Sequence, residues 1–363
     1  MAQNKKLIIF IPSIEDGGVE KNLYILLNYL EKKVNKIILI TYDSSKNHKF
    51  KKNIKIINPL LNFFNFKNRY TKYFLCLISL FKIIIFDKKN LVLSFQANIF
   101  AIILCTFLNI KILSRSNSSS VGWSKNSLKQ IFFNHFFKKA NEIIVNSFEF
   151  KKEMDKRYLI NTKCILNSFE FNKIKKLSLK KCKKIFQKKT LKIISIGRLT
   201  NQKDFLTLLK SIKMCKKKNI QLSIIGKGHE EEKLKNFTKK NDLQDKIKFL
   251  GYKNNPFNYL KQADIFILTS IFEGSPNVLI EAQFLKKFII STNCPTGPKE
   301  ILNNGKFGNL VKMKDHKAIA KILDNFSLNS KRKNMIHLGF KNLHKYDHTN
   351  NCEAYYKLLK NYL

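Results

Sequence analysis

The sequence is poor in several residue types that organise other classes of protein. Its 363 residues include seven cysteines, but there is no CxxC pair and no grouping of cysteine with histidine that resembles a metal site. An odd, dispersed set of thiols argues against a disulfide framework and suits a reducing cytoplasm. The six prolines are scattered and 44% of residues are hydrophobic, which excludes global disorder.

Long apolar runs are also absent. Residues 73–86 form the most apolar stretch, but Lys82 interrupts it and it is well short of the roughly 20 residues that span a bilayer. Basic residues flank this stretch, so it is consistent both with an interfacial membrane helix and with a core helix of an α/β domain. The apolar residues 7–12 are too few for a signal-peptide core and predict a first strand.

Acidic residues are scarce, and among the basic residues arginine is scarce. The net charge is +44, with five arginines against 64 lysines, and residues 1–180 carry +21 while the remainder carries +23. A nucleic-acid surface would concentrate this charge and favour arginine, so we expect no nucleic-acid partner. Charge-driven nucleic-acid binding stays as an alternative, which predicts salt-sensitive binding. An evenly basic surface is also attracted to anionic lipid headgroups.

Strand-like and helix-like segments alternate in two blocks, which predicts two doubly wound α/β domains. The first block predicts strands at 7–11, 36–41, 54–57, 91–95, 111–114 and 142–146 and helices at 19–33, 70–86, 98–108, 126–139 and 148–157. The second predicts strands at 192–196, 221–225, 246–250, 264–269, 288–291 and 308–311 and helices at 205–216, 230–238, 256–262 and 276–285. We expect domains at 1–170 and 191–345, a lysine-rich linker at 171–190 and a C-terminal segment 346–363 that is helical from 353 to 363.

The segment 264–281 carries the most chemistry. A buried strand ends in a short loop with Glu273 and Gly274, after which Ser275 is the expected N-cap and Pro276 the first residue of a helix. Ligands of open α/β sheets bind at the carboxyl ends of strands, where the N–H groups of a helix N-terminus attract an anion. Glu281 is the only charged residue within 277–285, so we expect a buried carboxylate that either accepts hydrogen bonds from a diol such as ribose or pairs with a lysine.

Three further loops that follow predicted strands carry candidate site residues. Arg198 and Lys203 would neutralise a diphosphate leaving group, or else form a solvated pair at a strand end. Gly17 and Gly18 would let a backbone approach a ligand closely, although a simple turn explains them equally well. Gly226 would approach a nucleobase or serve only as a turn. The spacing is not GxGxxG, so no dinucleotide cofactor is indicated.

Four motifs occur in an order that resembles retaining family 4 glycosyltransferases with the GT-B architecture. They are GGVEK at 17–21, GRLTNQK at 197–203, FEGSPNVLIEA at 272–282 and CPTGPKEIL at 294–302, and the last is similar to members that build bacterial surface glycans. The resemblance implies two Rossmann-like domains that face a central cleft, with a C-terminal helix that crosses back to the first domain.

The resemblance also implies residue roles. Glu281 would hold the ribose, Arg198 and Lys203 the diphosphate, and Glu273 the donor sugar. Further donor contacts would come from the Gly17–Gly18 loop and from Gly226, Gly274, Ser275, Asn277 and Val278. The sequence departs from the family at 113–117, where the usual histidine is missing and Arg115 or Asn117 would contact the acceptor side instead. There is no Asp-x-Asp pair, so we expect no metal and no other cofactor.

The expected activity is transfer of a hexose or N-acetylhexosamine, with retention, from a nucleotide-sugar to a glycan acceptor in cell-envelope synthesis. UDP-sugar is the expected donor and a polyprenyl-diphosphate-linked saccharide the expected acceptor. We expect a cytoplasmic enzyme at the inner face of the membrane, with peripheral contact to anionic lipid. The alternative is a UDP-sugar epimerase of similar two-domain build.

Overall fold

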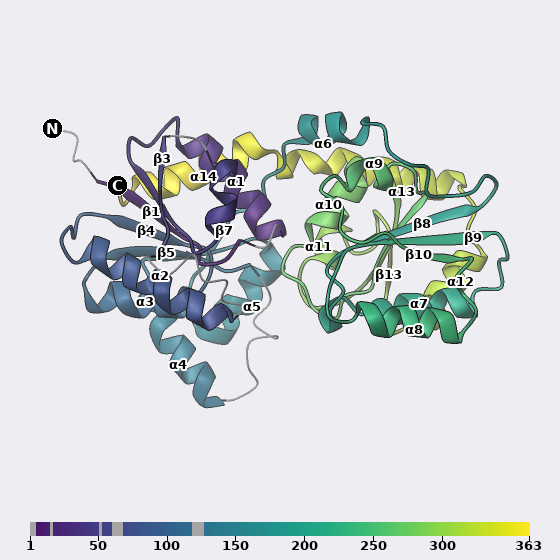
Figure 1. Ribbon diagram of the computed structural model, residues 1–363, viewed down its shortest axis with the longest axis horizontal. Helices are drawn as coiled ribbons and strands as arrows, with labels where there is room; N and C mark the ends of the chain where they lie inside the picture. The colour runs from purple at the N-terminus through teal and green to yellow at the C-terminus, as the bar shows by residue number, and fades with distance from the viewer. Residues whose placement is uncertain (1–4, 15–16, 51–52, 60–67, 118–126) are drawn as a thin grey trace. The chain divides into compact units, whose positions relative to one another are not determined.

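The computed structural model describes residues 5–14, 17–50, 53–59, 68–117 and 127–363. The chain divides into two compact units, one formed by Met1–Phe169 with Lys345–Leu363 and the other by Glu170–His344. Each unit is built around its own parallel sheet (Figure 1).

The first unit has a seven-stranded sheet in the order β3-β2-β1-β4-β5-β6-β7. Its strands are β1 (Leu7–Phe10), β2 (Ile37–Ile40), β3 (Ile54–Ile57), β4 (Leu91–Ser94), β5 (Lys111–Arg115), β6 (Glu142–Val145) and β7 (Lys163–Cys164). Its helices are α1 (Gly18–Leu30), α2 (Arg69–Ile84), α3 (Asn98–Phe107), α4 (Ser127–Phe137), α5 (Phe148–Tyr158) and α14 (His348–Lys360), with 3-10 turns η1 (Ser44–Lys49) and η4 (Asn342–Tyr346), the latter starting in the second unit.

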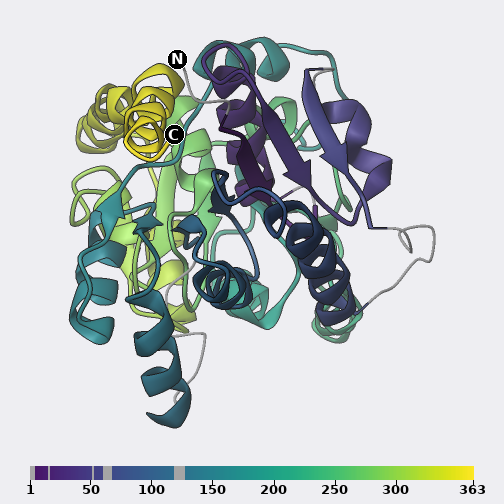
Figure 2. The ribbon, with the colours of Figure 1, turned by 90° about the vertical axis from the view of Figure 1, so that its left-hand side faces the viewer.

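Both faces of this sheet are covered. Leu7 and Ile9 pack with α1 and α14, whereas Ile8 and Phe10 pack with α2, α3 and α5 on the opposite face (Figure 1, Figure 2). Because successive side chains of a strand point to opposite faces, two covered faces require a continuous apolar run. The sequence of β1 is such a run, which explains why its position was predictable.

The second unit has a six-stranded sheet in the order β10-β9-β8-β11-β12-β13. Its strands are β8 (Leu191–Ile196), β9 (Ile220–Ile225), β10 (Ile247–Phe249), β11 (Ile265–Leu268), β12 (Phe288–Thr292) and β13 (Asn309–Val311). Its helices are α6 (Phe171–Ser178), α7 (Phe205–Met214), α8 (Glu231–Lys240), α9 (Phe257–Leu260), α10 (Asn277–Phe284), α11 (Pro298–Ile301), α12 (His316–Asp324) and α13 (Ser330–Lys341), with the 3-10 turn η3 (Asn201–Lys203).

Strand order reverses at one place in each sheet. In the first unit β2 and β4 flank β1, and in the second unit β9 and β11 flank β8. The connections on the two sides of such a point leave the sheet in opposite directions, so the loops at its carboxyl edge diverge and leave room for a ligand. The loops after β8 and β11 carry the GRLTNQK motif and Glu273, respectively.

Each predicted strand is present, with its ends within one or two residues of the prediction, and the two-domain α/β fold class is confirmed. The strand β7 was not predicted, and the other differences lie in the helices. Pro276, not Ser275, is the N-cap of α10, and no side chain caps this helix. The sequence analysis missed α11, α12 and α13. It also placed the start of α14 later than His348, although Asp347 caps this helix by accepting a hydrogen bond from the N–H of Thr349.

The lysine-rich segment 171–190 belongs to the second unit. It contains α6, which packs against α9, and the ring of Phe171 stacks on that of Phe284 with 4.8 Å between centroids. Ile174 and Ile185 are buried. A few apolar anchors among many lysines were therefore enough to form packed structure where composition indicated an exposed linker.

In the part of the chain that the structure describes, no helix combines the length and apolar character needed to cross a membrane.

Candidate active site

The loops after β8 and β11 are joined by four hydrogen bonds. The N–H of Ile271 donates to the Gln202 carbonyl at 2.9 Å, and the Gln202 side-chain amide donates to the Phe272 carbonyl at 2.9 Å. The Thr269 hydroxyl donates to the Lys203 carbonyl at 3.0 Å. Lys203 closes the set, because its Nζ lies 2.5 Å from Oε1 of Glu273.

The Lys203–Glu273 ion pair is mostly buried, with side chains 15% and 8% exposed. The Ser270 hydroxyl donates to the same Oε1 at 2.6 Å. A carboxylate oxygen that accepts two such bonds is held in one orientation. The structure thus brings together two residues that the sequence analysis assigned to the site, and it adds Ser270, which that analysis missed.

A third loop, after β12, holds the backbone of Glu273. The Thr296 hydroxyl donates to the Glu273 carbonyl at 2.6 Å, and the Glu273 N–H donates to the Pro295 carbonyl at 3.3 Å. Gly297 has φ +87°, and a Cβ there would lie 2.7 Å from the Gly274 carbonyl oxygen. Only glycine therefore permits the close approach of these two loops.

The loop after β9 packs against the GRLTNQK segment through Gly226. This residue has φ +151°, and a Cβ would lie 1.8 Å from the Gly197 carbonyl oxygen. The Leu199 N–H also donates to the Lys227 carbonyl at 2.9 Å. The described structure therefore gives Gly226 a packing role beside the exposed Arg198.

α10 begins at this edge of the sheet. Asn277 and Glu281 are one turn apart and both are buried, with Glu281 only 2% exposed. The expectation that this helix is buried on most sides is confirmed, since Leu279, Ile280 and Ala282 are fully buried. The N–H groups of the first turn, including that of Val278, give the N-terminus a positive potential.

Cys294 lies in this region but is not a nucleophile. Burial raises the pKa of its thiol to about 12, and the nearby Glu273 carboxylate adds to the increase. A cysteine reacts as its thiolate, so Cys294 stays protonated and inert at neutral pH.

In the first unit, Gln96 joins the loops after β1 and β4. Its side chain accepts from the Ser13 N–H at 3.0 Å and donates to Glu20 at 3.5 Å. Gly17 is the N-cap of α1 and Gly18 its first residue. The predicted glycine loop thus lies beside the switch point of its own sheet, and the sequence analysis missed Gln96.

Arg115 is enclosed in the core and not at an accessible edge. It is 1% exposed, with its guanidinium over the rings of Phe95 at 5.3 Å and Tyr355 at 5.6 Å. It donates to the Asn167 side chain at 2.6 Å. In this structure Arg115 connects β5 to α14 and does not reach solvent, which differs from the expected contact with an acceptor.

Asn117 lies at the end of β5, where its amide donates to the Phe95 carbonyl at 3.1 Å. Its Oδ1, the Ser116 hydroxyl and Oδ1 of Asn146 are buried and accept or donate no hydrogen bond within the described residues. Buried polar atoms are usually paired, so these three, at the ends of neighbouring strands, are candidates for a ligand. Their position directly after apolar strands is the signal that could have found Ser116 and Asn146.

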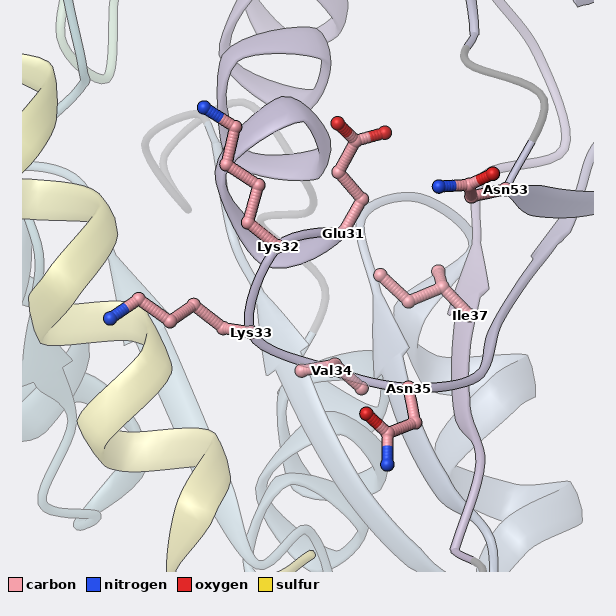
Figure 3. Close-up of a pocket in the computed structure, with 7 residues that line it drawn as sticks. All are labelled: Glu31, Lys32, Lys33, Val34, Asn35, Ile37 and Asn53. Atoms are coloured by element: carbon pink, nitrogen blue, oxygen red, sulfur yellow. The ribbon is translucent and has the colours of Figure 1, made fainter.

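A separate hollow lies at the opposite edge of the first sheet. It has a volume of about 270 Å³ and lies where α1 ends and β2 begins, lined by Glu31, Lys32, Lys33, Val34, Asn35, Ile37 and Asn53. Lys33 points toward α14 and Lys32 runs alongside α1, so the lining does not converge on a ligand (Figure 3). None of the predicted site residues lines it.

The described residues contain no group of three or more histidine, cysteine, aspartate or glutamate side chains able to hold a metal ion. The expectation that no metal takes part stays a prediction.

Comparison with known proteins agrees with this geometry. Residues 179–341, which include β8, β11 and α10, match the family Glycosyl transferases group 1. An uncharacterized glycosyltransferase of Methanocaldococcus jannaschii is 35% identical over 271 residues, 69% of this chain and 65% of that protein. A Campylobacter jejuni enzyme is 25% identical over 85% of this chain and 86% of its own length. Its name describes a 4-alpha-N-acetylgalactosaminyltransferase acting on a diphospho-undecaprenol-linked saccharide.

Solved structures show the same fold over the whole chain. A glycosyltransferase from Rickettsia africae superposes with a TM-score of 0.78 at 19% identity and covers 99% of both chains. Anabaena HepE in complex with UDP-glucose superposes with a TM-score of 0.77 at 14% identity, covering 98% of this chain and 99% of HepE. The motifs, the two parallel sheets and these matches together identify the chain as a member of the glycosyltransferase group 1 family with the GT-B fold.

Proposed function

We propose that this protein transfers a hexose or N-acetylhexosamine from a UDP-sugar to a lipid-linked glycan, with retention at the anomeric carbon. The observation that carries the proposal is the Lys203–Glu273 pair, which stands at the switch point of the second sheet near the start of α10. A cation, a carboxylate and a helix N-terminus at this edge suit a sugar diphosphate.

The donor is supported by two observations. Anabaena HepE, which shares the fold, was solved with UDP and with UDP-glucose. In this chain the exposed Arg198 and the adjacent Lys203 supply positive charge for a diphosphate, while the buried Glu281 supplies a carboxylate for the ribose hydroxyls.

The reaction follows from this assignment. The bond between the anomeric carbon and the diphosphate breaks, and the acceptor hydroxyl oxygen bonds to that carbon on the same face. The hydroxyl proton passes to the departing diphosphate, so no covalent enzyme intermediate is needed. Arg198, Lys203 and the first-turn N–H groups of α10 stabilise the developing negative charge, and Glu273 supports the positive character of the sugar.

The acceptor class is inferred from relatives. Two Campylobacter jejuni relatives are named for undecaprenol-diphosphate-linked saccharides, and an Erwinia amylovora relative is named for amylovoran biosynthesis. On the acceptor side we place Asn117 with Ser116 and Asn146, whose side-chain oxygens have no hydrogen-bond partner among the described residues and follow neighbouring strands of the first sheet. The seven free cysteines support a cytoplasmic location, where nucleotide-sugars are made.

The test is a donor screen with mixed polyprenyl-diphosphate-linked acceptors, read by mass spectrometry, with the new linkage determined by NMR. Lys203→Gln should reduce turnover about 10²- to 10³-fold because a leaving-group contact is lost. Lys210→Gln is the matched control, since this lysine is exposed on α7. Conversion of the UDP-sugar without any acceptor would instead indicate an epimerase.

A further inference from the structure

α2 presents apolar side chains to solvent along its whole length. Tyr70, Phe74, Ile78, Phe81 and Ile85 follow one another at spacings of three or four residues and are between 38% and 64% exposed. Residues at these spacings share one face of a helix. They therefore form a continuous apolar stripe on the outer side of the first unit.

The opposite side of α2 packs against the core of the first unit. Cys76, Leu80 and Ile84 are fully buried and belong to the core beneath the sheet. A surface helix of a water-soluble domain is usually polar on the face opposite its buried stripe. Packing within the unit therefore explains the inner face of α2 and leaves the outer one unexplained.

Neighbouring helices carry further exposed apolar side chains. α3 packs between α2 and α4 on the same face of the sheet (Figure 1, Figure 2). Phe107 at the end of α3 is 85% exposed, Phe86 just beyond α2 is 89% exposed, and Ile131 on α4 is 66% exposed. We use the term docking surface for the exposed apolar side chains of these three helices and of the two residues that follow α2. They are Tyr70, Phe74, Ile78, Phe81, Ile85, Phe86, Phe100, Phe107, Ile131 and Phe132.

The charged side chains of α2, α3 and α4 are all basic, and Lys72 of α2 pairs with the nearby Asp43. α2, α3 and α4 contain no aspartate or glutamate. Exposed cations stand at the ends of these helices: Arg69 begins α2, Lys88 and Lys89 follow it, and Lys138 and Lys139 follow α4. The nearby Asp87 is paired with Lys6, with 3.0 Å between Oδ2 and Nζ. Aromatic residues combined with lysines suit the anionic headgroup region of a bilayer.

We propose that the docking surface binds the interface of an anionic lipid bilayer, with the aromatic side chains inserted at the headgroup level and the lysines on lipid phosphates. The choice of a bilayer as partner rests on the proposed function, since a polyprenyl-linked acceptor is held in a membrane. A second copy of the chain fits less well. A symmetric dimer through this face would bring the same cations together in a protein of net charge +44.

The experiment measures co-sedimentation of the full-length protein with two kinds of vesicle, pure phosphatidylcholine and an equimolar mixture with phosphatidylglycerol. We expect binding to the mixed vesicles that weakens as salt increases. The triple variant Phe74→Gln, Phe81→Gln, Phe107→Gln should bind them at least about tenfold more weakly, because the inserted apolar area is lost. Glutamine is a good helix former, and these side chains are exposed, so the fold should be unaffected.

Two matched controls test whether binding depends on where the substituted residues lie and not only on the loss of apolar or basic side chains. The variant Tyr252→Gln, Met313→Gln, Leu328→Gln removes three exposed apolar side chains from the second unit and should bind like the wild type. The variant Lys82→Gln, Lys88→Gln, Lys89→Gln should weaken binding to mixed vesicles more than Lys213→Gln, Lys239→Gln, Lys240→Gln, which removes three exposed lysines of the second unit.

Equal binding by the wild type and the Phe74, Phe81, Phe107 variant would overturn the proposal. A second result would also overturn it. In that case sedimentation velocity would show that the wild type is a dimer and the variant a monomer, and neither protein would bind vesicles. Calorimetry of UDP binding distinguishes failure of the membrane proposal from failure of the proposed function. Loss of docking with UDP binding intact affects only the membrane proposal, and wild-type docking without UDP binding affects only the donor assignment.

Discussion

Lys203 and Glu273 are 70 residues apart in the chain, and their side chains meet at 2.5 Å across the point where the strand order of the second sheet reverses. The lysine ends η3 and the glutamate follows β11, so the pair joins the two loops that flank the switch point. This mostly buried ion pair therefore holds the two loops together at the carboxyl edge of the sheet.

Loss of Lys203 should destabilise the fold as well as reduce turnover. Lys203→Met leaves a carboxylate that is 8% exposed without its cation, a change that costs about 3 kcal/mol when a buried pair is broken. Urea unfolding at neutral pH measures this loss, and Lys210→Met on the exposed side of α7 should leave the midpoint unchanged. An unchanged midpoint for Lys203→Met would show that the pair is not formed in solution.

Ser270 should act as a positioning residue for Glu273. Ser270→Ala removes the hydroxyl that donates to Oε1 at 2.6 Å, which should cost about 1–2 kcal/mol of stability and lower kcat with little change in the donor KM. Ser211→Ala is the matched control, because that buried hydroxyl bonds only a carbonyl within α7. A change in KM alone would contradict a role in orienting Glu273.

Gly226 should tolerate no side chain. Gly226→Ala would place a Cβ 1.8 Å from the Gly197 carbonyl oxygen in a backbone conformation with φ +151°, at a cost of about 2–4 kcal/mol. Gly251→Ala is the comparison, since its φ is also positive, at +66°, but the nearest atom to its Cβ is 3.9 Å away, and the expected cost is only about 1 kcal/mol. Thermal unfolding of both variants checks the difference, and equal losses would contradict the packing role of Gly226.

Arg115 should prove structural and Asn117 functional. Arg115→Met keeps much of the volume between Phe95 and Tyr355, so we expect a change in stability within about 1 kcal/mol and an unchanged acceptor KM. Asn117→Ala removes an oxygen that is unpaired in the described structure and should raise the acceptor KM. Steady-state kinetics with varied acceptor decide the matter. If Arg115→Met is stable but has a raised acceptor KM, Arg115 contributes to acceptor binding and its role is not only structural.

Lys287 should make stability depend on alkaline pH. Burial lowers the pKa of its ammonium group to about 8 from the usual 10.5. Between these two values the unfolded chain binds more protons than the folded one, so the free energy of unfolding should rise with pH across this window. Unfolding of the wild type and of Lys287→Met at several pH values measures this, with the exposed Lys299→Met as control. The extra slope should be absent in Lys287→Met and present in the control.

The pattern of apolar residues was enough to predict the strands and the two-domain fold. β1 and β11 are buried on both faces, so their sequences are continuous apolar runs that are visible in the sequence alone. The GRLTNQK and FEGSPNVLIEA segments could be placed because each follows a predicted strand and leads into a predicted helix. Some helices were harder to predict from the sequence. In α13, for example, Gly339 is the one residue classed as buried, so its sequence shows little apolar periodicity.

The sequence by itself therefore determined which loops carry the predicted site residues, because loop position follows from local strand and helix signals. Only the tertiary structure decided which atoms meet. Glu273 receives Lys203 and Ser270 and is held by Thr296 because three parallel strands deliver their loops to one edge, a relationship with no trace in local sequence. Arg115 is buried for the same reason, since Tyr355 from the end of the chain covers it.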